Sequence, residues 1–265
     1  MIEALDFPNS ATVRAPEFLV LQGGRRRMLD IPVRYGVFRH TKVGTCLIDT
    51  GYSARVTGGT RSLALRIYNA LLRPRLTDQA LPGARPDAST IILTHLHADH
   101  IAALRDYPGA RILADRTALE HYLAMGSRRL RHGVFAELLP DNVLERVEDI
   151  HDLRQARAPL GLGPGRDVFG DGSVLAVPLP GHMRGHVGLC FARFDPPLLY
   201  AADAQWLHRA VMEDRLPGPP AAWVYDDAAT TRDSARRIRA FVEKGGQVVY
   251  CHDPDIPADL PQGHT

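Results

Sequence analysis

The chain has 265 residues, of which 45% are hydrophobic and 23% are charged, and its formal net charge is +2. A chain of this size can bury a large core, its composition is ordinary for a globular protein, and so mild a charge gives no argument for a nucleic-acid partner. The first residues include acidic side chains where a signal peptide has basic ones, and no apolar run is as long as a membrane span. The three cysteines are widely spaced. We therefore expect a cytoplasmic protein without a membrane partner.

Residues 17–50 have the pattern of an antiparallel meander of strands. The first strand is expected at 18–21 and the last at 45–48, directly before Asp49. An aspartate in this position can have either of two roles, and the spacing of residues in the sequence does not distinguish them. It can be a turn former, or it can be a carboxylate that orients a metal-bound imidazole.

The rest of the chain alternates between expected strands and helices. Further strands are expected at 90–93, 111–114, 173–179, 186–192, 198–203 and 247–252. Helices are expected at 60–72, 101–104 and 117–125 and after Thr230. This alternation predicts a layered α/β structure. Residues 126–170 are the least regular part of the chain, and we expect a loop or cap segment there, within one domain that spans 1–265.

Two of the expected helices have specific sequence signals. In the helix at 60–72, Leu63, Ile67 and Leu71 recur at helical spacing, which is typical of an amphipathic helix. The last helix follows Thr230 and Asp233, which have the spacing of a capping box.

The stretch from Thr94 to His100 reads Thr-His-Leu-His-Ala-Asp-His and follows an apolar strand. If the chain is still extended there, His95, His97 and Asp99 lie on one side and His100 points elsewhere. Such an arrangement suits two metal ions side by side rather than one. Imidazole and carboxylate ligands without a thiolate favour zinc, with iron, manganese and cobalt as alternatives.

Three further candidate ligands, His182, Asp203 and His252, each follow an apolar strand. Side chains at strand ends are held by a rigid scaffold and face an open edge of the sheet, where α/β folds place their chemistry. Cys251 precedes His252, and strand alternation would turn it to the opposite face, into the core.

Together these motifs resemble those of the metallo-β-lactamase superfamily. The matching stretches, in chain order, are Ile48-Asp49-Thr50-Gly51, His95-x-His97-x-Asp99-His100, Gly181-His182-x-x-Gly185-His186, Ala202-Asp203-Ala204 and Cys251-His252-Asp253. The resemblance covers roughly residues 17–255. It implies a four-layer αββα sandwich of two mixed β-sheets flanked by helices.

The resemblance also implies a ligand set for two divalent metal ions, zinc in the first instance. One ion would be held by His95, His97 and His182, and the other by Asp99, His100 and His252. Asp203 and a hydroxide would bridge the two ions, and the hydroxide would attack the substrate. Asp99 could pass the proton to the leaving alkoxide, and His186 would be a supporting residue rather than a ligand.

Within the superfamily the chain resembles the N-acyl homoserine lactonases, through its compact C-terminus and the spacing from Asp203 to His252. Many of those lactonases have a tyrosine three residues after the bridging aspartate, where its hydroxyl meets the substrate carbonyl. Trp206 occupies that position here, and an indole N–H can donate a hydrogen bond but cannot act as an acid. Trp206 is therefore a candidate substrate-contacting residue.

Three activities remain open from the sequence. The first is a dinuclear hydrolase that opens a lactone or cleaves a small ester, and the second is a thioester or organophosphate hydrolase with the same site. The third is an oxidoreductase with a single iron, similar to the superfamily's persulfide dioxygenases. A small-molecule substrate is expected in each case, and a homodimer is left open.

Overall fold

The computed structural model describes residues 1–85, 87–218 and 221–257. The chain divides into two compact units. We call residues 3–14 and 32–149 the first unit, and residues 1–2, 15–31 and 150–265 the second unit. The expectation of one domain over 1–265 stays a prediction, and it includes residues 258–265, which lie outside the described part of the chain.

The first unit contains a six-stranded sheet in the order β1-β4-β5-β7-β8-β9. The strands are β1 (Ile2–Asp6), β4 (Gly36–His40), β5 (Gly44–Ile48), β7 (Thr90–Ile92), β8 (Arg111–Ala114) and β9 (Val147–Asp149). Strands β5, β7, β8 and β9 run parallel to one another, whereas β4 pairs antiparallel with β5. The central parallel strands are almost continuous apolar runs, as expected of strands that are covered on both faces.

The helices of the first unit connect or follow these strands. They are α2 (Ala54–Thr57), α3 (Leu63–Leu72), α4 (Ala98–Ile101), α5 (Arg116–Ala124) and α6 (Val143–Arg146), with the 3-10 helices η1 (Leu104–Asp106), η2 (Gly126–His132) and η3 (Ala136–Leu138). Since β5 and β7 are parallel neighbours, with Ile48 opposite Ile92, the residues that follow them lie at the same edge of the sheet.

The second unit contains a six-stranded sheet whose order, β10 to β15, follows the chain. The strands are β10 (Gln155–Ala158), β11 (Gly163–Asp167), β12 (Val174–Pro178), β13 (Val187–Phe191), β14 (Leu198–Ala202) and β15 (Gln247–Tyr250). All neighbours pair antiparallel except β14 and β15, which are parallel. Strands β12, β14 and β15 therefore all end at the same edge.

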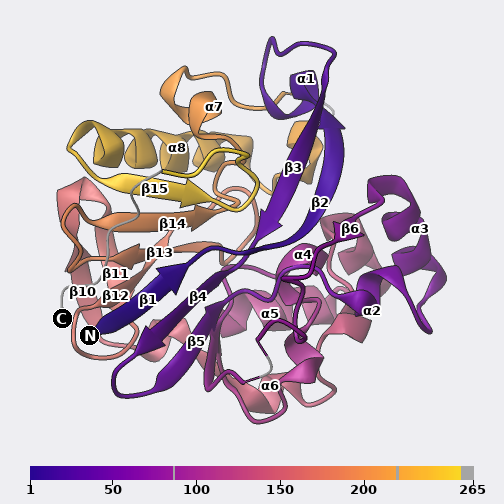
Figure 1. Cartoon of the computed structure of the whole chain (residues 1–265), viewed down its shortest axis with the longest axis horizontal. Coiled ribbons are helices and arrows are strands. Elements are labelled where there is room, and N and C mark those ends of the chain that lie inside the picture. The colour runs from indigo at the N-terminus through magenta and orange to yellow at the C-terminus, as the bar shows by residue number, and fades with distance from the viewer. Residues whose placement is uncertain (86, 219–220, 258–265) are drawn as a thin grey trace. The chain divides into compact units, whose positions relative to one another are not determined.

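The helices of the second unit are α1 (Glu17–Val20), α7 (His208–Met212) and α8 (Ala228–Glu243), with the 3-10 helices η4 (Ile150–Asp152), η5 (Pro159–Gly161) and η6 (Ala221–Val224). Helix α8 lies along β15 (Figure 1). Its buried residues Ile238 and Phe241 pack in one core cluster with sheet residues such as Val177, Leu199 and Val248. Two mixed sheets with helices, the predicted α/β class, are thus present.

A third sheet has the order β3-β2-β6 and is formed by β2 (Asn9–Pro16), β3 (Met28–Arg34) and β6 (Arg75–Leu76). The strand expected at 18–21 is instead the short helix α1. The buried carboxylate of Glu17 accepts hydrogen bonds from the Arg25 N–H and from Arg27 Nη2, each at 2.8 Å. These bonds hold the chain in a compact turn between β2 and β3. The spacing of apolar residues cannot predict such bonds, because they join residues that are eight and ten positions apart.

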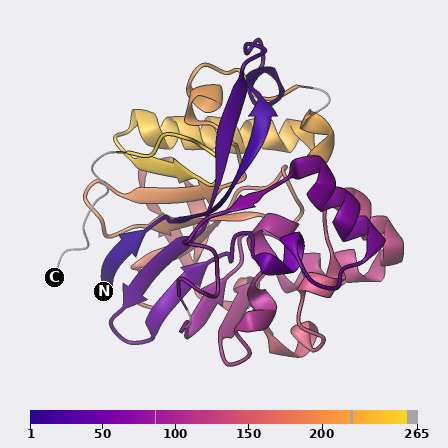
Figure 2. The ribbon, with the colours of Figure 1, turned by 45° about the vertical axis from the view of Figure 1, so that its right-hand side comes forward.

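The helix expected at 60–72 is present as α3, which comes forward on the right in Figure 2. Its apolar stripe, however, is exposed. Leu63, Ile67 and Leu71 are 70%, 52% and 76% exposed. The helix instead buries Leu65 and packs Tyr68, whose hydroxyl is 2.7 Å from that of Tyr52. Helical periodicity shows that a helix has an apolar face, but it does not show which face meets the core.

Two further expectations differ from the structure. Residues 126–170, expected to be a loop or cap, contain β9, β10 and β11 as well as α6 and short 3-10 helices. Strand β11 is rich in Gly and Pro, and β9 and β10 are only three and four residues long, so the sequence has no longer run of alternation that would identify these strands. Helix α8 begins at Ala228, with Asp227 rather than Thr230 as its N-cap, because Asp227 Oδ1 accepts the N–H groups of Ala229 and Thr230. None of the helices in the described part of the chain combines the length and apolar character needed to cross a membrane.

Candidate metal centre

In the first unit the histidine-rich stretch leaves the end of β7 and turns into α4. His97 is the N-cap of α4, so Asp99 and His100 lie on its first turn rather than on an extended strand. The expected alternation therefore ends at His97. His95, Asp99 and His100 are buried.

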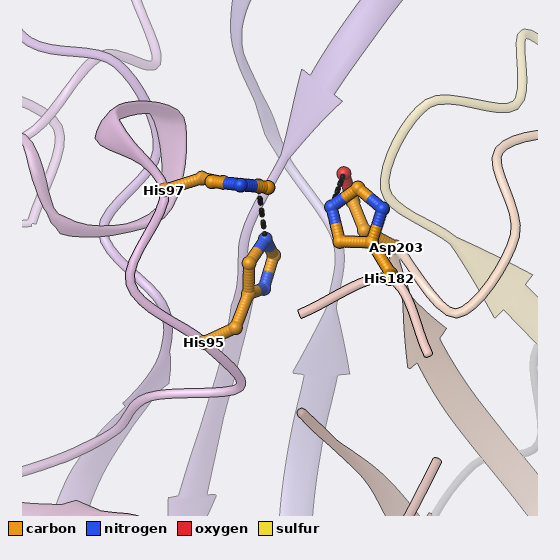
Figure 3. A group of neighbouring side chains, drawn as sticks. All are labelled: His95, His97, His182 and Asp203. Carbon is orange, nitrogen blue, oxygen red and sulfur yellow. Dashed lines mark hydrogen bonds and ion pairs between the residues drawn. The ribbon is translucent and has the colours of Figure 1, made fainter. Parts of the chain in front are cut away.

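His95 and His97 face each other in the first unit. His95 Nε2 lies 3.0 Å from His97 Nδ1, and the two rings meet edge to face (Figure 3). Gly133, at the end of η2, lies against His97, and a Cβ at Gly133 would be 3.0 Å from His97 Cδ2. The close approach of a backbone with φ +67° explains a glycine at this position.

Asp49 is buried at the end of β5 and contacts His100. Its Oδ2 lies 2.8 Å from His100 Nδ1, and Thr94 donates to both carboxylate oxygens, from its N–H and its hydroxyl, at 2.7 Å. Burial raises the pKa of Asp49 above its usual value, and the nearby His100 opposes this shift. Of the two interpretations of Asp49, the structure therefore favours the carboxylate that orients an imidazole.

In the second unit, His182, Asp203 and His252 follow β12, β14 and β15 at one sheet edge. Asp203 Oδ2 lies 3.5 Å from His182 Nε2 (Figure 3) and 3.1 Å from His252 Nε2. His186 Nε2 accepts the backbone N–H of Asp203 at 3.2 Å, which agrees with a supporting role. Strand direction thus explains why residues 182, 203 and 252, far apart in sequence, come together.

The donor types and spacings within each unit fit metal ligands. Two ligands bound about 2.1 Å from one zinc ion lie about 3.4 Å apart at the tetrahedral angle. The His95–His97 and His182–Asp203 separations of 3.0 and 3.5 Å are close to this value, as is the 3.8 Å between His100 Nε2 and Asp99 Oδ2. The residues present therefore suit divalent metal ions.

Cys251 is fully buried, as expected of a core residue, but the expectation that it faces away from His252 is wrong. The sulfur of Cys251 lies within 4.8 Å of the ligand atoms of Asp203 and His252. Strand β15 ends at Tyr250 and the chain then bends, so strand alternation no longer sets the direction of the Cys251 side chain. A thiol thus lies beside nitrogen and oxygen donors in the second unit.

The ring of Trp206 lies against His182, with ring centroids 6.2 Å apart. The ring of Tyr225 packs against both of these rings, with its centroid 5.7 Å from that of His182 and 5.8 Å from that of Trp206. The sequence did not indicate Tyr225 as a site residue. Burial, with a further effect of the Asp203 charge, raises the pKa of the Tyr225 hydroxyl. Tyr225 precedes α8 in an irregular segment, where no sequence periodicity could have identified it.

Comparison with known proteins finds a family model described as the metallo-beta-lactamase superfamily, which matches residues 32–252. An N-acyl homoserine lactonase AttM from Azorhizobium caulinodans is 27% identical over 240 residues, covering 85% of this chain and 83% of the relative. AttM from Agrobacterium fabrum is 28% identical over 244 residues, covering 87% and 85%.

Solved structures share the fold. A variant of AiiA from B. thuringiensis with N-decanoyl-L-homoserine at its active site has a TM-score of 0.70 at 19% identity, covering 96% of this chain and 94% of that one. AidC, a dizinc quorum-quenching lactonase in complex with its product, has a TM-score of 0.62 at 15% identity, covering 98% and 95%. At these identities the likeness concerns the fold alone.

Proposed function

This chain belongs to the metallo-beta-lactamase superfamily, and on that premise we propose that it is a dinuclear metal-dependent lactonase. The chain has the superfamily's fold and is a metal-dependent hydrolase. Beyond the family and the reaction class, we propose two ions, a named set of ligands and a lactone as substrate.

A carboxylate shared by two imidazoles is the observation that carries this function. Asp203 Oδ2 is within 3.5 Å of both His182 Nε2 and His252 Nε2. We infer that Asp203 would be a ligand shared by two ions, with His182 holding one ion and His252 the other. The remaining ligands, assigned from the order of the superfamily's motifs, are His95 and His97 for the first ion and Asp99 and His100 for the second.

Two divalent ions held by these residues, zinc in our assignment, would supply Lewis acidity and would lower the pKa of a bound water. The residues of the chain orient the ligands and handle protons. Asp49 accepts the Nδ1–H of His100, which leaves Nε2 as the nitrogen available for a ligand bond. Asp99 can carry a proton to the leaving oxygen of the substrate. The indole of Trp206 beside His182 offers an apolar wall for an acyl chain.

The lactone substrate is supported by the relatives. AttM proteins, at 27% and 28% identity over most of their length, are named N-acyl homoserine lactonases. An uncharged lactone also suits a site whose flanking side chains in the second unit are aromatic rings. We therefore propose N-acyl homoserine lactones as the first substrates to test.

The experiment measures metal content and lactone opening on the same purified protein. We expect about two ions per chain by inductively coupled plasma spectrometry, and acid release from N-hexanoyl homoserine lactone in a pH-indicator assay. An open-chain ester of the same acid, a thioester and a phosphotriester complete the panel. A metal count well below one per chain would contradict the metal centre. Turnover of only the thioester or phosphotriester would contradict the lactone while retaining the site.

A variant separates the protein's own catalysis from contamination. His252→Ala removes one of the two imidazoles that contact Asp203, so the lactone activity should fall by a factor on the order of 100 or more. The metal content should fall toward one ion per chain. Unchanged activity together with a fall in metal content would show that another protein in the preparation is responsible, whereas unchanged activity and metal content would remove His252 from the ligand set.

A further inference from the structure

Tyr225 is part of a cluster of three rings in the second unit, which we call the aromatic cluster: His182, Trp206 and Tyr225. The ring planes of Tyr225 and His182 meet at 66°, with centroids 5.7 Å apart. The Tyr225 and Trp206 rings are tilted at 53°, with centroids 5.8 Å apart. The Tyr225 side chain therefore borders a candidate metal ligand directly.

The backbone that follows Tyr225 is fixed to the loop that carries His182. The Asp226 N–H donates to the His182 carbonyl at 3.2 Å, and the Asp227 N–H donates to the Gly181 carbonyl at 3.0 Å. In return the Asp226 carboxylate accepts the N–H of Arg184 at 2.8 Å. These bonds set the position of Tyr225 relative to His182. A group that contacts a substrate at a defined place must be held in this way.

The hydroxyl of Tyr225 is buried and has no hydrogen-bond partner among the described residues. A buried hydroxyl without a partner is unfavourable, because it has lost its bonds to water without replacement. A phenol has an ordinary pKa near 10 and so keeps its proton at neutral pH. Tyr225 therefore holds an unused hydrogen-bond donor beside His182 and in the electrostatic range of Asp203.

We propose that the Tyr225 hydroxyl donates a hydrogen bond to the substrate oxygen on which negative charge develops when the ester carbonyl is attacked. This assignment rests on the proposed lactonase function. The hydroxyl supplies a hydrogen bond and transfers no proton, so Tyr225 polarises the carbonyl while the leaving oxygen takes its proton elsewhere. Trp206 contributes the neighbouring apolar surface, and the polar contact comes from Tyr225, a residue 19 positions further along the chain.

Tyr225→Phe tests this role because it removes the hydroxyl and keeps the ring. A donor to a developing oxyanion is worth a factor of about 100 to 1000 in kcat. We expect kcat for N-hexanoyl homoserine lactone to fall by a factor on the order of 100, with KM changed less than kcat. Metal content and melting temperature should match those of the wild type. Binding of the ring-opened product N-hexanoyl homoserine, measured by calorimetry on the zinc-loaded protein, should weaken about tenfold, since a hydrogen bond to a charged oxygen is lost.

The matched control is Tyr250→Phe. The Tyr250 hydroxyl, on β15 of the same unit, is also buried and without a hydrogen-bond partner in the described part of the chain, but its ring contacts His208 rather than the aromatic cluster. This variant should retain the wild-type kcat and product affinity. Equal losses in both variants would mean that any buried hydroxyl of this unit matters for stability, and would overturn the proposal.

Failure of this inference and failure of the proposed function give different results. If the wild type opens the lactone and Tyr225→Phe does so equally well, the hydroxyl has no role in catalysis and only this inference is wrong. If the metal-loaded wild type opens no lactone, the proposed function is wrong and this inference falls with it. A metal content that drops in Tyr225→Phe would assign the residue to the metal site and would also overturn the proposal.

Discussion

Asp49 Oδ2 lies 2.8 Å from His100 Nδ1, although 51 residues separate the two in the chain. The contact arises because Asp49 follows β5 and His100 lies in the segment after β7, and these strands are parallel neighbours. Asp49→Asn keeps the shape but removes the charge, so it should weaken the orientation and basicity of the imidazole. We expect metal affinity to fall by a factor of about 10 to 100, measured by competition with a chromophoric chelator.

The control for this variant is Asp106→Asn, which removes a carboxylate that pairs with Arg55 nearer the surface of the same unit. A surface ion pair contributes about 0–1 kcal/mol, and this one does not contact a candidate ligand. Its metal affinity should equal that of the wild type. If Asp49→Asn bound metal as tightly as the wild type, Asp49 would be a turn former and would not orient a metal ligand.

His97→Ala removes one of two imidazoles whose nitrogens are 3.0 Å apart. If His97 is a ligand of one ion, its loss should empty that position and reduce the metal content from about two ions per chain toward one. Activity should fall by a factor on the order of 100 or more, since outer partners alone are worth 10 to 100. The matched control is His132→Ala, whose ring packs on Tyr122, and it should keep both ions. Full metal content in His97→Ala would remove His97 from the ligand set.

Trp206→Tyr changes the ring that lies against His182 while leaving the proposed ligands intact. The smaller ring shortens the apolar wall and adds a hydroxyl, so the preference among acyl chains should shift, with metal content unchanged. The measurement is the ratio of kcat/KM for N-hexanoyl and N-decanoyl homoserine lactones, with plasma spectrometry for the metals. A loss of metal in this variant would show that Trp206 supports the ligands rather than the substrate.

The sequence predicts those parts of the site that depend on strand ends. One predicted strand is followed by three imidazoles and a carboxylate, and three other strands are each followed by a single candidate ligand. The sequence shows these residues because an apolar run marks where a strand ends, even when the neighbouring strands of the sheet are not known. The sequence leaves the partner of His100 open because a contact across parallel strands depends on register. Alternation does not predict the direction of Cys251 because it stops where β15 ends. The sequence does not indicate Tyr225 because the position of this residue depends on backbone bonds to the His182 loop.

The same limit applies to the fold. The α/β class follows from alternating patterns, and most of the expected strands are present within a residue or two of their predicted bounds. The exposed stripe of α3 shows that periodicity fixes a helix but not the face that the rest of the chain will cover. Helix α1 depends on Glu17 bonds to residues that follow eight and ten positions later, beyond the range of local patterns.

Gly181→Ala should destabilise the second unit strongly. Gly181 has φ +123°, and a Cβ there would lie 2.5 Å from Thr231 Cα and collide with its backbone nitrogen, so α8 would have to move. We expect a loss of more than about 3 kcal/mol in the free energy of unfolding by urea denaturation. Gly245→Ala is the control, because φ is +93° but nothing lies within 4 Å, and it should cost about 1–2 kcal/mol. Similar costs for both variants would contradict a steric cause.

Glu17 should make the stability of the protein depend on pH in the acid range. Hydrogen bonds from Arg27 and from the Arg25 N–H lower its pKa from 4.5 to about 2. A folded-state pKa below the unfolded value means that the stabilisation is complete above about pH 4.5 and is lost as the pH falls toward about 2. Glu17→Gln cannot titrate, so the difference in unfolding free energy between pH 5 and pH 3 should be smaller in this variant than in the wild type. Urea denaturation with the metals chelated measures this difference without competition between protons and metal ions.

Arg27→Ala removes the largest cause of the pKa shift of Glu17, so its unfolding free energy should also depend less on pH than that of the wild type. If the unfolding free energies of all three proteins changed equally with pH, the Glu17 contacts would not control this dependence.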